Sequence, residues 1–425
     1  MKESSLRPAW QLPMQWPSAR PGTPDAPWTV ADRDYLRKSA IVFTLVALTA
    51  LDRFGLHVTP DYSIPAELMA MYALAAATLL SGRGELNPHS ALAYLALVCV
   101  AATSHFVNLG FEARQYISTP SLLLLLASYA PFVISPRRDG SAPQLGPWAL
   151  ERYVEFMLFV AAAGMAQHFV QFVYQPPWLF DFRPMIPEAL RGSGGWNTVY
   201  TVGGWTKANG FFLREPSMFS TAMAFGLLAE MSLGKRKWAM AVLAFALILS
   251  YSGSGLLALS IAMLFPLGRG TALRLLVCAV LVGVAVLLLG DLLNLSYTLN
   301  RVGEITSERS SAYCRFVYPG LMTGQLLDST YWSLLLGHGP GSMERMGATC
   351  EDLHSVAYAK SIFEYGVLGA AAFAALVFGA LARSGTPLRM RIAAAVTFAL
   401  LGGLYNAEIL ALIYLLYAVW PREGA

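Results

Sequence analysis

Charged side chains are scarce in this sequence of 425 residues. Asp, Glu, Lys and Arg make up 13% of it, whereas hydrophobic residues make up 56% and the mean hydropathy is +0.50. A water-soluble domain carries roughly 25% charged residues, because its surface has to be hydrated. The composition therefore excludes an ordinary soluble domain and predicts a chain that is largely surrounded by lipid.

The first 38 residues lack the features of a cleavable signal peptide. They are polar and Pro-rich, and they contain no apolar run ahead of a small-residue cleavage site. We expect residues 1–38 to form a cytoplasmic tail. The chain also lacks zinc-finger spacing, an RNP-type pattern and a basic-aromatic stripe, and its net charge is only +4. No nucleic acid partner is therefore expected.

Long apolar runs recur along the rest of the chain, and about 20 apolar residues suffice to cross the hydrocarbon core as a helix. We predict an all-α polytopic membrane protein with 11 or 12 transmembrane helices. They form a single transmembrane domain, residues 39–420, followed by a short C-terminal tail, residues 421–425. The last apolar region is either one long helix or two short ones around Asn406 and Glu408. The predicted spans are 39–56, 64–80, 90–108, 119–135, 152–174, 212–233, 237–251, 254–268, 272–290, 354–382 and 392–420.

The basic residues indicate how these spans are oriented. Most of the 30 Lys and Arg lie in the N-terminal tail or in alternate short loops, such as those around Arg83, 235–237 and 383–391. Short basic loops stay on the cytoplasmic side of a membrane. We therefore place the N-terminus in the cytoplasm and the protein in a bacterial inner membrane.

Two long segments, 175–211 and 291–353, break the short-loop pattern, and both fall on the periplasmic side. Long loops are usually functional or disordered, and the aromatic content of these two argues against disorder. The rings are either interfacial anchors or platforms on which sugars stack. Cys314 and Cys350 share the second loop in an oxidising compartment, which predicts a disulfide between them. The aromatic residues are Trp178, Trp196, Trp205, Tyr313, Tyr318, Tyr331 and Trp332.

The segment 211–217 combines a basic residue with a predicted helix start. Pro216 suits the first turn of a helix, so a positive dipole end and free backbone N–H groups are expected beside Arg214. Such an end is a receptor for phosphate or pyrophosphate. Glu215 and Ser217 would support it. The alternative is an arginine that merely pairs with Glu215 at the membrane edge.

Two further stretches lie in the second outer loop. Arg309 and Arg315 are six residues apart, so both can meet one anion only if the segment between them bends. The glycine-rich stretch 336–342 predicts a tight turn, because glycine permits close backbone approach. We assign His338 to this turn rather than to catalysis.

The stretch 351–354, Glu-Asp-Leu-His, precedes the predicted span 354–382. A histidine at the membrane edge can take a proton from a sugar hydroxyl, and Asp352 could orient it. The alternatives for His354 are a helix cap or a metal ligand with its acidic neighbours, although no Asp-x-Asp pair supports a metal. Glu364 lies deeper, where a charge within a span indicates a structural or site role.

In order, these segments resemble the O-antigen ligase/polymerase family of membrane glycosyltransferases. The resemblance rests on Arg-Glu-Pro-Ser at 214–217, Tyr-Ser-Gly-Ser-Gly-Leu-Leu-Ala-Leu at 251–259, Gly-His-Gly-Pro-Gly at 337–341 and His354 followed by Glu-Tyr-Gly-Val-Leu-Gly. It covers roughly 205–375 and looks most like exopolysaccharide polymerases of the Wzy type. Two departures stand at Gly255, where members often carry arginine, and at Ser355, where they often carry asparagine.

The resemblance implies a GT-C-like membrane fold and a polymerase. It would join repeat units carried on undecaprenyl pyrophosphate, with donor and acceptor both lipid-linked, at the periplasmic face. Arg214, Arg309 and Arg315 would bind the pyrophosphate and His354 would be the general base. One displacement would invert the anomeric centre, and neither a metal nor a cofactor is expected. A chain-length regulator protein would be a further partner.

Two other functions stay open. A ligase of the same family would pass the glycan to lipid A-core instead of to another repeat unit. A flippase or other transporter for lipid-linked oligosaccharide belongs to a different class, and it would concentrate ionisable groups near the middle of the bilayer. In this sequence the charges collect at the predicted outer edge, which favours chemistry at the membrane surface.

Overall fold

The computed structural model describes residues 30–59, 62–110, 115–137, 145–192, 201–202, 205–266, 310–327, 330–346 and 356–420. The protein is mostly helical, as the sequence predicts. The strands found in these ranges form three antiparallel two-stranded sheets.

Many of the helices lie at predicted spans. They are α1 (Val30–Ala47), α2 (Ala66–Leu80), α3 (Pro88–Leu109), α4 (Thr119–Tyr129), α5 (Leu145–Val170), α6 (Pro216–Leu233), α7 (Lys237–Leu249), α8 (Gly253–Met263), α11 (Ser311–Phe316), α12 (Tyr318–Leu327), α13 (Tyr331–Leu336), α14 (Ser342–Met346), α15 (Ala357–Arg383), α16 (Leu388–Val396) and α17 (Ala407–Val419).

Short elements connect these helices. The sheets pair β1 (Gly55–Thr59) with β2 (Tyr62–Pro65), β3 (Gly84–Leu86) with β4 (Ile134–Pro136) and β5 (Thr201–Val202) with β6 (Trp205–Thr206). The single turns are η3 (Ala130–Val133), η4 (Pro177–Leu179), η5 (Arg183–Met185), η6 (Glu188–Leu190) and the π-helical η8 (Thr397–Leu401).

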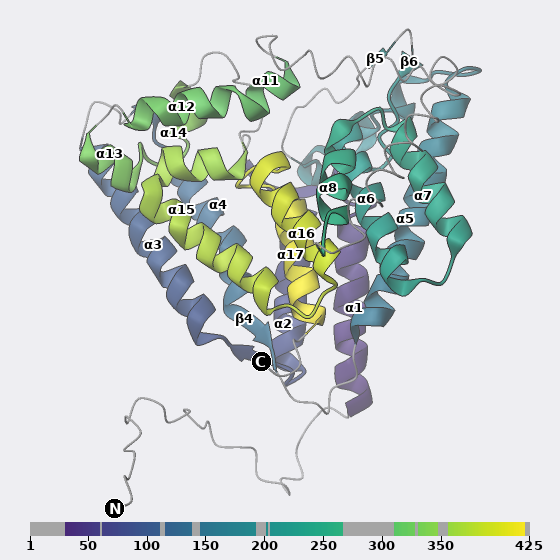
Figure 1. Ribbon diagram of the computed structural model, residues 1–425, viewed down its shortest axis with the longest axis horizontal. Coiled ribbons are helices and arrows are strands. Elements are labelled where there is room, and N and C mark those ends of the chain that lie inside the picture. The colour runs from purple at the N-terminus through teal and green to yellow at the C-terminus, as the bar shows by residue number, and fades with distance from the viewer. Residues whose placement is uncertain are drawn as a thin grey trace, which may run out of the picture.

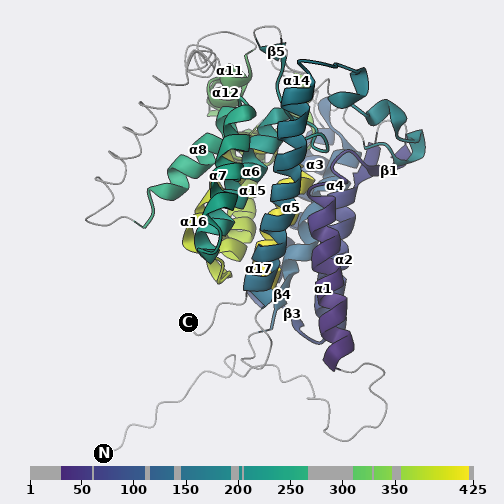
Figure 2. The same ribbon diagram turned by 90° about the vertical axis from the view of Figure 1, so that its right-hand side faces the viewer.

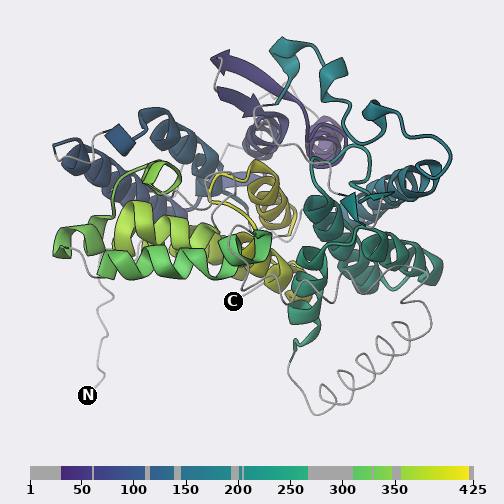
Figure 3. The ribbon, with the colours of Figure 1, turned by 90° about the horizontal axis from the view of Figure 1, so that it is seen from above.

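Helix α17 forms the centre of the molecule. In Figure 1, α3, α4 and α15 lie on one side of it and α5 to α8 on the other. The view from above in Figure 3 shows the same central position. Every residue of α17 is buried, and the helix contacts α1, α2, α5 and α15. A helix that is apolar all round is stable only when neighbours cover it on every side, which explains this placement.

Among the described residues, three helices, α3, α5 and α15, are long and apolar enough to cross a membrane. Five shorter apolar helices, α2, α4 with η3, α7, α8 and α17, lie at predicted spans. The protein is therefore a membrane protein by composition and helix length, and the count of 11 or 12 spans stays a prediction. The predicted span 272–290 lies outside the described residues.

The largest differences from the predicted boundaries concern α1 and α5. The first span was placed at 39–56, but α1 runs from Val30 to Ala47, and residues 51–59 form turns and strand β1. Asp52 and Arg53 are drawn into ion pairs there, which a continuing helix could not provide. Helix α5 begins at Leu145 rather than at residue 152.

The last apolar region consists of two helical pieces rather than one. Gly402 is extended and ends η8, and the Asn406 side chain then accepts a hydrogen bond from Ile409 N and caps α17. Of the two alternatives for this region, the broken one is confirmed. The break matters, because residues 402–408 carry side chains of the candidate site.

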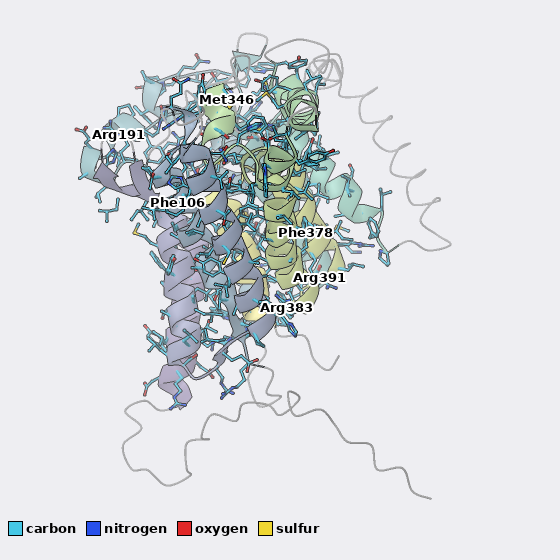
Figure 4. The ribbon with its side chains drawn as sticks, turned by 90° about the vertical axis from the view of Figure 1, so that its left-hand side faces the viewer. Phe106, Arg191, Met346, Phe378, Arg383 and Arg391 are labelled. Carbon is cyan, nitrogen blue, oxygen red and sulfur yellow. The ribbon has the colours of Figure 1, made fainter. Side chains whose placement is uncertain are left out.

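The described parts of both predicted outer loops lie at the same end of the molecule. Figure 2 shows α11, α12, α14, β1 and β5 at one end and the β3–β4 sheet at the other. In Figure 4, Arg191 and Met346 lie near the first end, whereas Arg383 and Arg391 lie toward the opposite one. Which of the two ends faces the periplasm stays a prediction.

Candidate functional site

A polar ladder holds the strand that leads to Arg214 against helix α5. Gln167 donates to Asn209 Oδ1 at 2.8 Å and accepts from Asn209 N at 2.9 Å. Gln171 likewise donates to Thr206 O at 3.0 Å and accepts from Thr206 N at 2.7 Å. All four residues are buried or nearly so, and buried polar groups that satisfy one another fix the backbone in one arrangement. The start of α6 at Pro216 is as the sequence predicts.

Arg214 is bound along one edge by Asp52. Its backbone N donates to Asp52 Oδ2 at 2.7 Å and its Nε to Oδ1 at 3.0 Å, and Nη2 forms an ion pair with Oδ1 at 2.8 Å. Asp52 is fully buried, whereas 23% of the Arg214 side chain is exposed. Within the described ranges no hydrogen bond involves Nη1 of Arg214. The guanidinium is therefore held rigidly on one edge and retains a donor on the other.

Two more carboxylates surround this pair. Glu67 lies in the first turn of α2 and Glu408 in the first turn of α17, and both are buried. Neither oxygen of Glu67 has a hydrogen-bond partner in the described part of the chain. Burial alone would lower the pKa of Arg214, but Asp52, Glu67 and Glu408 raise it overall, so the guanidinium stays charged. We call Asp52, Glu67, Arg214 and Glu408 the Arg214 cluster.

Arg53 joins the Arg214 cluster to the first outer loop. It is 1% exposed and donates to the carbonyls of Phe180, Phe212 and Leu213 and to Asp181 Oδ1. Burial lowers its pKa to about 10, with Asp181 and Asp52 opposing the effect, so Arg53 is protonated at neutral pH.

The Asp181 carboxylate has two arginine partners. It accepts from Arg53 Nη1 at 2.7 Å and from Arg183 Nε at 2.8 Å. Burial would raise the pKa of Asp181, but its hydrogen bonds and the charges of Arg183 and Arg53 lower it overall. The first outer loop is thus fixed by ion pairs to the backbone that precedes Arg214.

Helix α6, which begins just after Arg214, packs closely against α8. Helix α8 contains most of the stretch 251–259 that carries the family resemblance. Ser254 Oγ donates to Ser217 O at 3.0 Å, and Gly255 N donates to Ser220 Oγ at 3.0 Å. A Cβ on Gly255 would lie 2.1 Å from Ser220 O. Members of the family that the sequence resembles often carry arginine where Gly255 stands. The close contact with Ser220 leaves no room for such a side chain.

A second cluster surrounds the buried Glu364 on α15. Lys360 Nζ bonds Glu344 Oε1 at 2.5 Å and lies 3.7 Å from Glu364 Oε1 and 4.6 Å from the centre of the Tyr405 ring. Tyr405 in turn donates to Glu364 Oε2 at 3.4 Å and meets the hydroxyl of Tyr365 at 3.0 Å. Lys360 is 2% exposed and Glu364 is fully buried. We call these five residues the Glu364 cluster.

The glycine-rich turn closes over this cluster. His338 N donates to Phe363 O and Gly339 N to Glu364 O, each at 2.9 Å. Helix α15 is kinked at Gly366, whose φ of 66° favours glycine, and Gly337 has a φ of 72°. The ring of His338 packs on Phe363 at 4.9 Å, and burial lowers the pKa of His338. The contacts agree with its assignment to the turn.

Residues 402–408 link the two clusters. Gly402 O accepts from Ala357 N at 3.0 Å and Gly403 pairs with Val356. Tyr405 then reaches Glu364, while Glu408, three residues on, contributes to the field at Arg214. The start of α15 is therefore tied to the same segment that meets both clusters.

The structure brings some predicted site residues together and leaves others untested. Arg214, Glu215 and Ser217 are adjacent, with Ser217 Oγ donating to Glu215 Oε2 at 2.6 Å, and Glu364 lies in the second cluster. Arg315 is in the last turn of α11. The predicted Arg309, Asp352, His354 and Cys350 lie outside the described residues, and so does Glu351.

One half of the predicted disulfide is described. Cys314 is buried and disulfide-bonded, whereas Cys99 is a free thiol. Cys278 and Cys350 are not among the described residues, so the pairing of Cys314 with Cys350 stays a prediction. In the described ranges no group of three or more His, Cys, Asp and Glu could hold a metal ion.

Sequence reasoning missed the partners of the predicted residues. Asp52, Glu67, Glu408 and Lys360 were not predicted as site residues, although each is a charge next to or inside a predicted apolar span. Charged residues in such positions are uncommon and usually paired or functional, which is the signal that could have found them.

The fold and these clusters define a membrane protein with buried ion pairs where apolar helices begin. Residues 195–421 match the family described as WcaD colanic acid polymerase, and the chain belongs to this family. The matched range contains Arg214, Lys360, Glu364 and Glu408, whereas Asp52 and Glu67 precede it. No curated protein matches the chain. The family is one of polysaccharide polymerases, which implies lipid-linked oligosaccharide substrates.

Proposed function

We propose that the protein polymerises repeat units carried on undecaprenyl pyrophosphate, at the periplasmic face of the inner membrane. The observation that carries the proposal is the state of Arg214, which Asp52 holds on one edge while Nη1 keeps its donor. Arg214 also stands two residues before the first residue of α6, where the helix dipole favours an anion. A fixed, charged donor at a helix start suits a pyrophosphate oxygen.

The proposed reaction is a single displacement. A hydroxyl oxygen of the acceptor attacks the anomeric carbon of the donor while the bond from that carbon to the pyrophosphate breaks. His354 takes the hydroxyl proton, with Asp352 orienting its ring, and the lipid pyrophosphate departs with the bonding electrons. Arg214, Arg309 and Arg315 stabilise the charge that develops on it. One displacement inverts the anomeric centre, and arginine charge takes the part that a metal plays elsewhere.

The Glu364 cluster supports a positioning role for α15 in this proposal. His354 is two residues before Val356 in the sequence, and Val356 pairs with Gly403. The segment 402–408 then runs from this pairing to Glu408 beside Arg214. Lys360 joins α15 to Glu344 on α14, and Tyr405 of the segment 402–408 contacts both Lys360 and Glu364. Glu364 has this positioning role in our proposal.

Polymerase activity is preferred to ligase activity because the matched family is described as a polymerase. A ligase would use the same donor chemistry with lipid A-core as acceptor. The two differ in product, since a polymerase yields a ladder of lengths and a ligase yields glycan joined to lipid A-core. The bilayer is part of the site in either case, and a chain-length regulator is a further predicted partner.

Reconstitution tests the proposal. Purified protein in liposomes with lipid-linked repeat units is expected to produce a polymer ladder on a gel, without added metal or nucleotide sugar. Arg214→Ala and His354→Ala should abolish the ladder. Arg137→Ala is the matched control, because Arg137 is an exposed arginine whose side chain lies 3.9 Å from Glu85. Full activity of either site variant would contradict the mechanism.

A further inference from the structure

An open apolar groove lies beside the Arg214 cluster. It has a volume of about 490 Å³, within the size range of small-molecule sites. Its walls come from Phe54, which follows α1, and from the two ends of the first outer loop, residues 175–211. The lining residues are Phe54, Trp178, Phe182, Met185, Ile186, Pro187 and Phe211.

One wall of the groove contacts Arg53, which also binds the backbone just before Arg214. Phe182 stacks on Phe211 with ring centres 5.1 Å apart, and the Arg53 guanidinium lies 5.0 Å from the Phe182 ring. Arg53 binds the carbonyls of Phe212 and Leu213, the two residues before Arg214. The buried Arg53 therefore connects the wall of the groove to the backbone that precedes Arg214.

The lip of the groove is exposed apolar surface. Met185 is 72% exposed and Trp178 is 45% exposed. Exposed apolar surface of this kind marks a binding site when a built groove accompanies it. An occupant has to be apolar, because every residue that lines the groove is apolar. A soluble sugar does not meet this requirement.

We infer that the groove binds the isoprenoid units adjacent to the pyrophosphate of the lipid-linked donor. The inference rests on the proposed function for the presence of such a donor. Drawing a pyrophosphate to Arg214 lifts the first isoprenoid units out of the bilayer. The groove covers those units, so that the head group can reach the arginine without exposing hydrocarbon to water.

Photolabelling tests which molecule occupies the groove. A donor with a diazirine in the isoprenoid units nearest the pyrophosphate is added to the reconstituted protein, and labelled peptides are mapped by mass spectrometry. Label is expected in residues 178–187 and should be competed by unlabelled long-chain polyprenyl diphosphate but not by phospholipid vesicles. Competition by phospholipid, or label spread only over membrane helices, would overturn the inference in favour of a general lipid contact.

A kinetic comparison separates the groove from folding effects. Met185→Ser should raise KM for a long-chain donor roughly tenfold, the effect of losing an apolar contact in a pocket. It should leave kcat, and KM for a donor with a very short prenyl chain, nearly unchanged. Leu321→Ser is the control, because Leu321 is an exposed apolar residue on α12 at the same end of the molecule. Equal losses for both donor lengths would overturn the inference.

The two proposals fail in different ways. If the wild-type protein makes polymer but the groove is never labelled, the proposed function stands and the groove inference is wrong. If the groove is labelled specifically but no polymer forms, the groove inference stands and the polymerase proposal is wrong.

Discussion

Asp52 binds Arg214 across 162 residues of sequence, through the arginine's backbone N at 2.7 Å, its Nε at 3.0 Å and its Nη2 at 2.8 Å. One carboxylate thus fixes both the backbone and the side chain of the residue that we propose binds pyrophosphate. Asp52 leaves Nη1 of Arg214 able to donate to a ligand. In our proposal Asp52 is therefore a positioning residue for Arg214.

Asp52→Asn is therefore expected to impair polymerisation while sparing the fold more than the loss of Arg214 does. The amide has the shape of the carboxylate but is uncharged and has one acceptor oxygen instead of two. It therefore binds the three donors of Arg214 less well. A misplaced arginine should reduce kcat by on the order of 100-fold, since small displacements in a reactive geometry have effects of that size. Initial rates of ladder formation measure the change.

The matched control for this variant is Glu155→Gln. Glu155 pairs with Arg152 at 2.6 Å, and both side chains are 40% exposed. An exposed ion pair contributes little, so this variant should retain wild-type rates. If Asp52→Asn retained them as well, Asp52 would have no positioning role.

Lys360→Met should destabilise the protein, because it leaves Glu364 buried without its cation. Removing one partner of a buried ion pair costs about 3–5 kcal/mol. The double variant Lys360→Met/Glu364→Gln should recover much of that loss, since the remaining partner is no longer charged. Thermal unfolding in nanodiscs measures each variant.

Glu344→Gln is the informative comparison for Lys360. Glu344 is 43% exposed, so its loss should matter far less than the loss of Lys360. A double variant as unstable as Lys360→Met alone would mean that the ion pair with Glu364 is not the source of the effect.

Gly337→Ala is expected to lower stability by more than about 1 kcal/mol, because φ at this position is +72° and the added Cβ would lie 2.3 Å from the Glu364 carbonyl carbon. The turn and the kinked helix cross there backbone to backbone. Gly324→Ala, in α12 with nothing within 4 Å of the added Cβ, should be neutral or stabilising. Melting temperatures that fall equally for both variants would refute the close crossing.

Local features of the site could be predicted from the sequence, and long-range pairings could not. Pro216 marks the start of α6 because proline fits the first helical turn, and that prediction is confirmed. The glycines of residues 337–341 likewise predicted a tight turn, because glycine permits close backbone approach. No local pattern links Arg214 to Asp52, however, because the two residues are 162 positions apart and meet only in the folded chain.

The fold shows the same division. Apolar runs predicted the positions of most helices, because the hydrophobicity of a segment can be read from the sequence alone. The end of α1 was placed wrongly because Leu51 and Phe54 extend the apolar run, while the ion pairs of Asp52 and Arg53 turn the chain. Lys360 and Glu364 are four residues apart on one helix, a visible signal, but their burial depends on α14 and Tyr405.

Mild acid should destabilise the protein through His338. Burial lowers the pKa of His338, so the unfolded chain, with a value near 6.5, binds the proton more readily than the folded protein. The stability that neutral His338 provides is present above pH 6.5 and declines as the pH falls below it. Melting temperatures from pH 7.5 to 5.5 should fall for the wild type and fall less for His338→Phe, whose ring can still pack on Phe363. An unchanged slope in this variant would exclude His338 as the cause.

The predicted disulfide can be tested apart from activity. If Cys314 pairs with Cys350, digestion without reductant should release one linked pair of peptides, visible by mass spectrometry. Cys314→Ser, Cys350→Ser and the double variant should then destabilise the protein by the same amount, about 3–4 kcal/mol for a closed loop of this length. Cys99→Ser should have no such effect, because Cys99 is a free thiol. Unequal single variants, or a linked peptide containing Cys278, would show that Cys314 has another partner and that the second outer loop is closed differently.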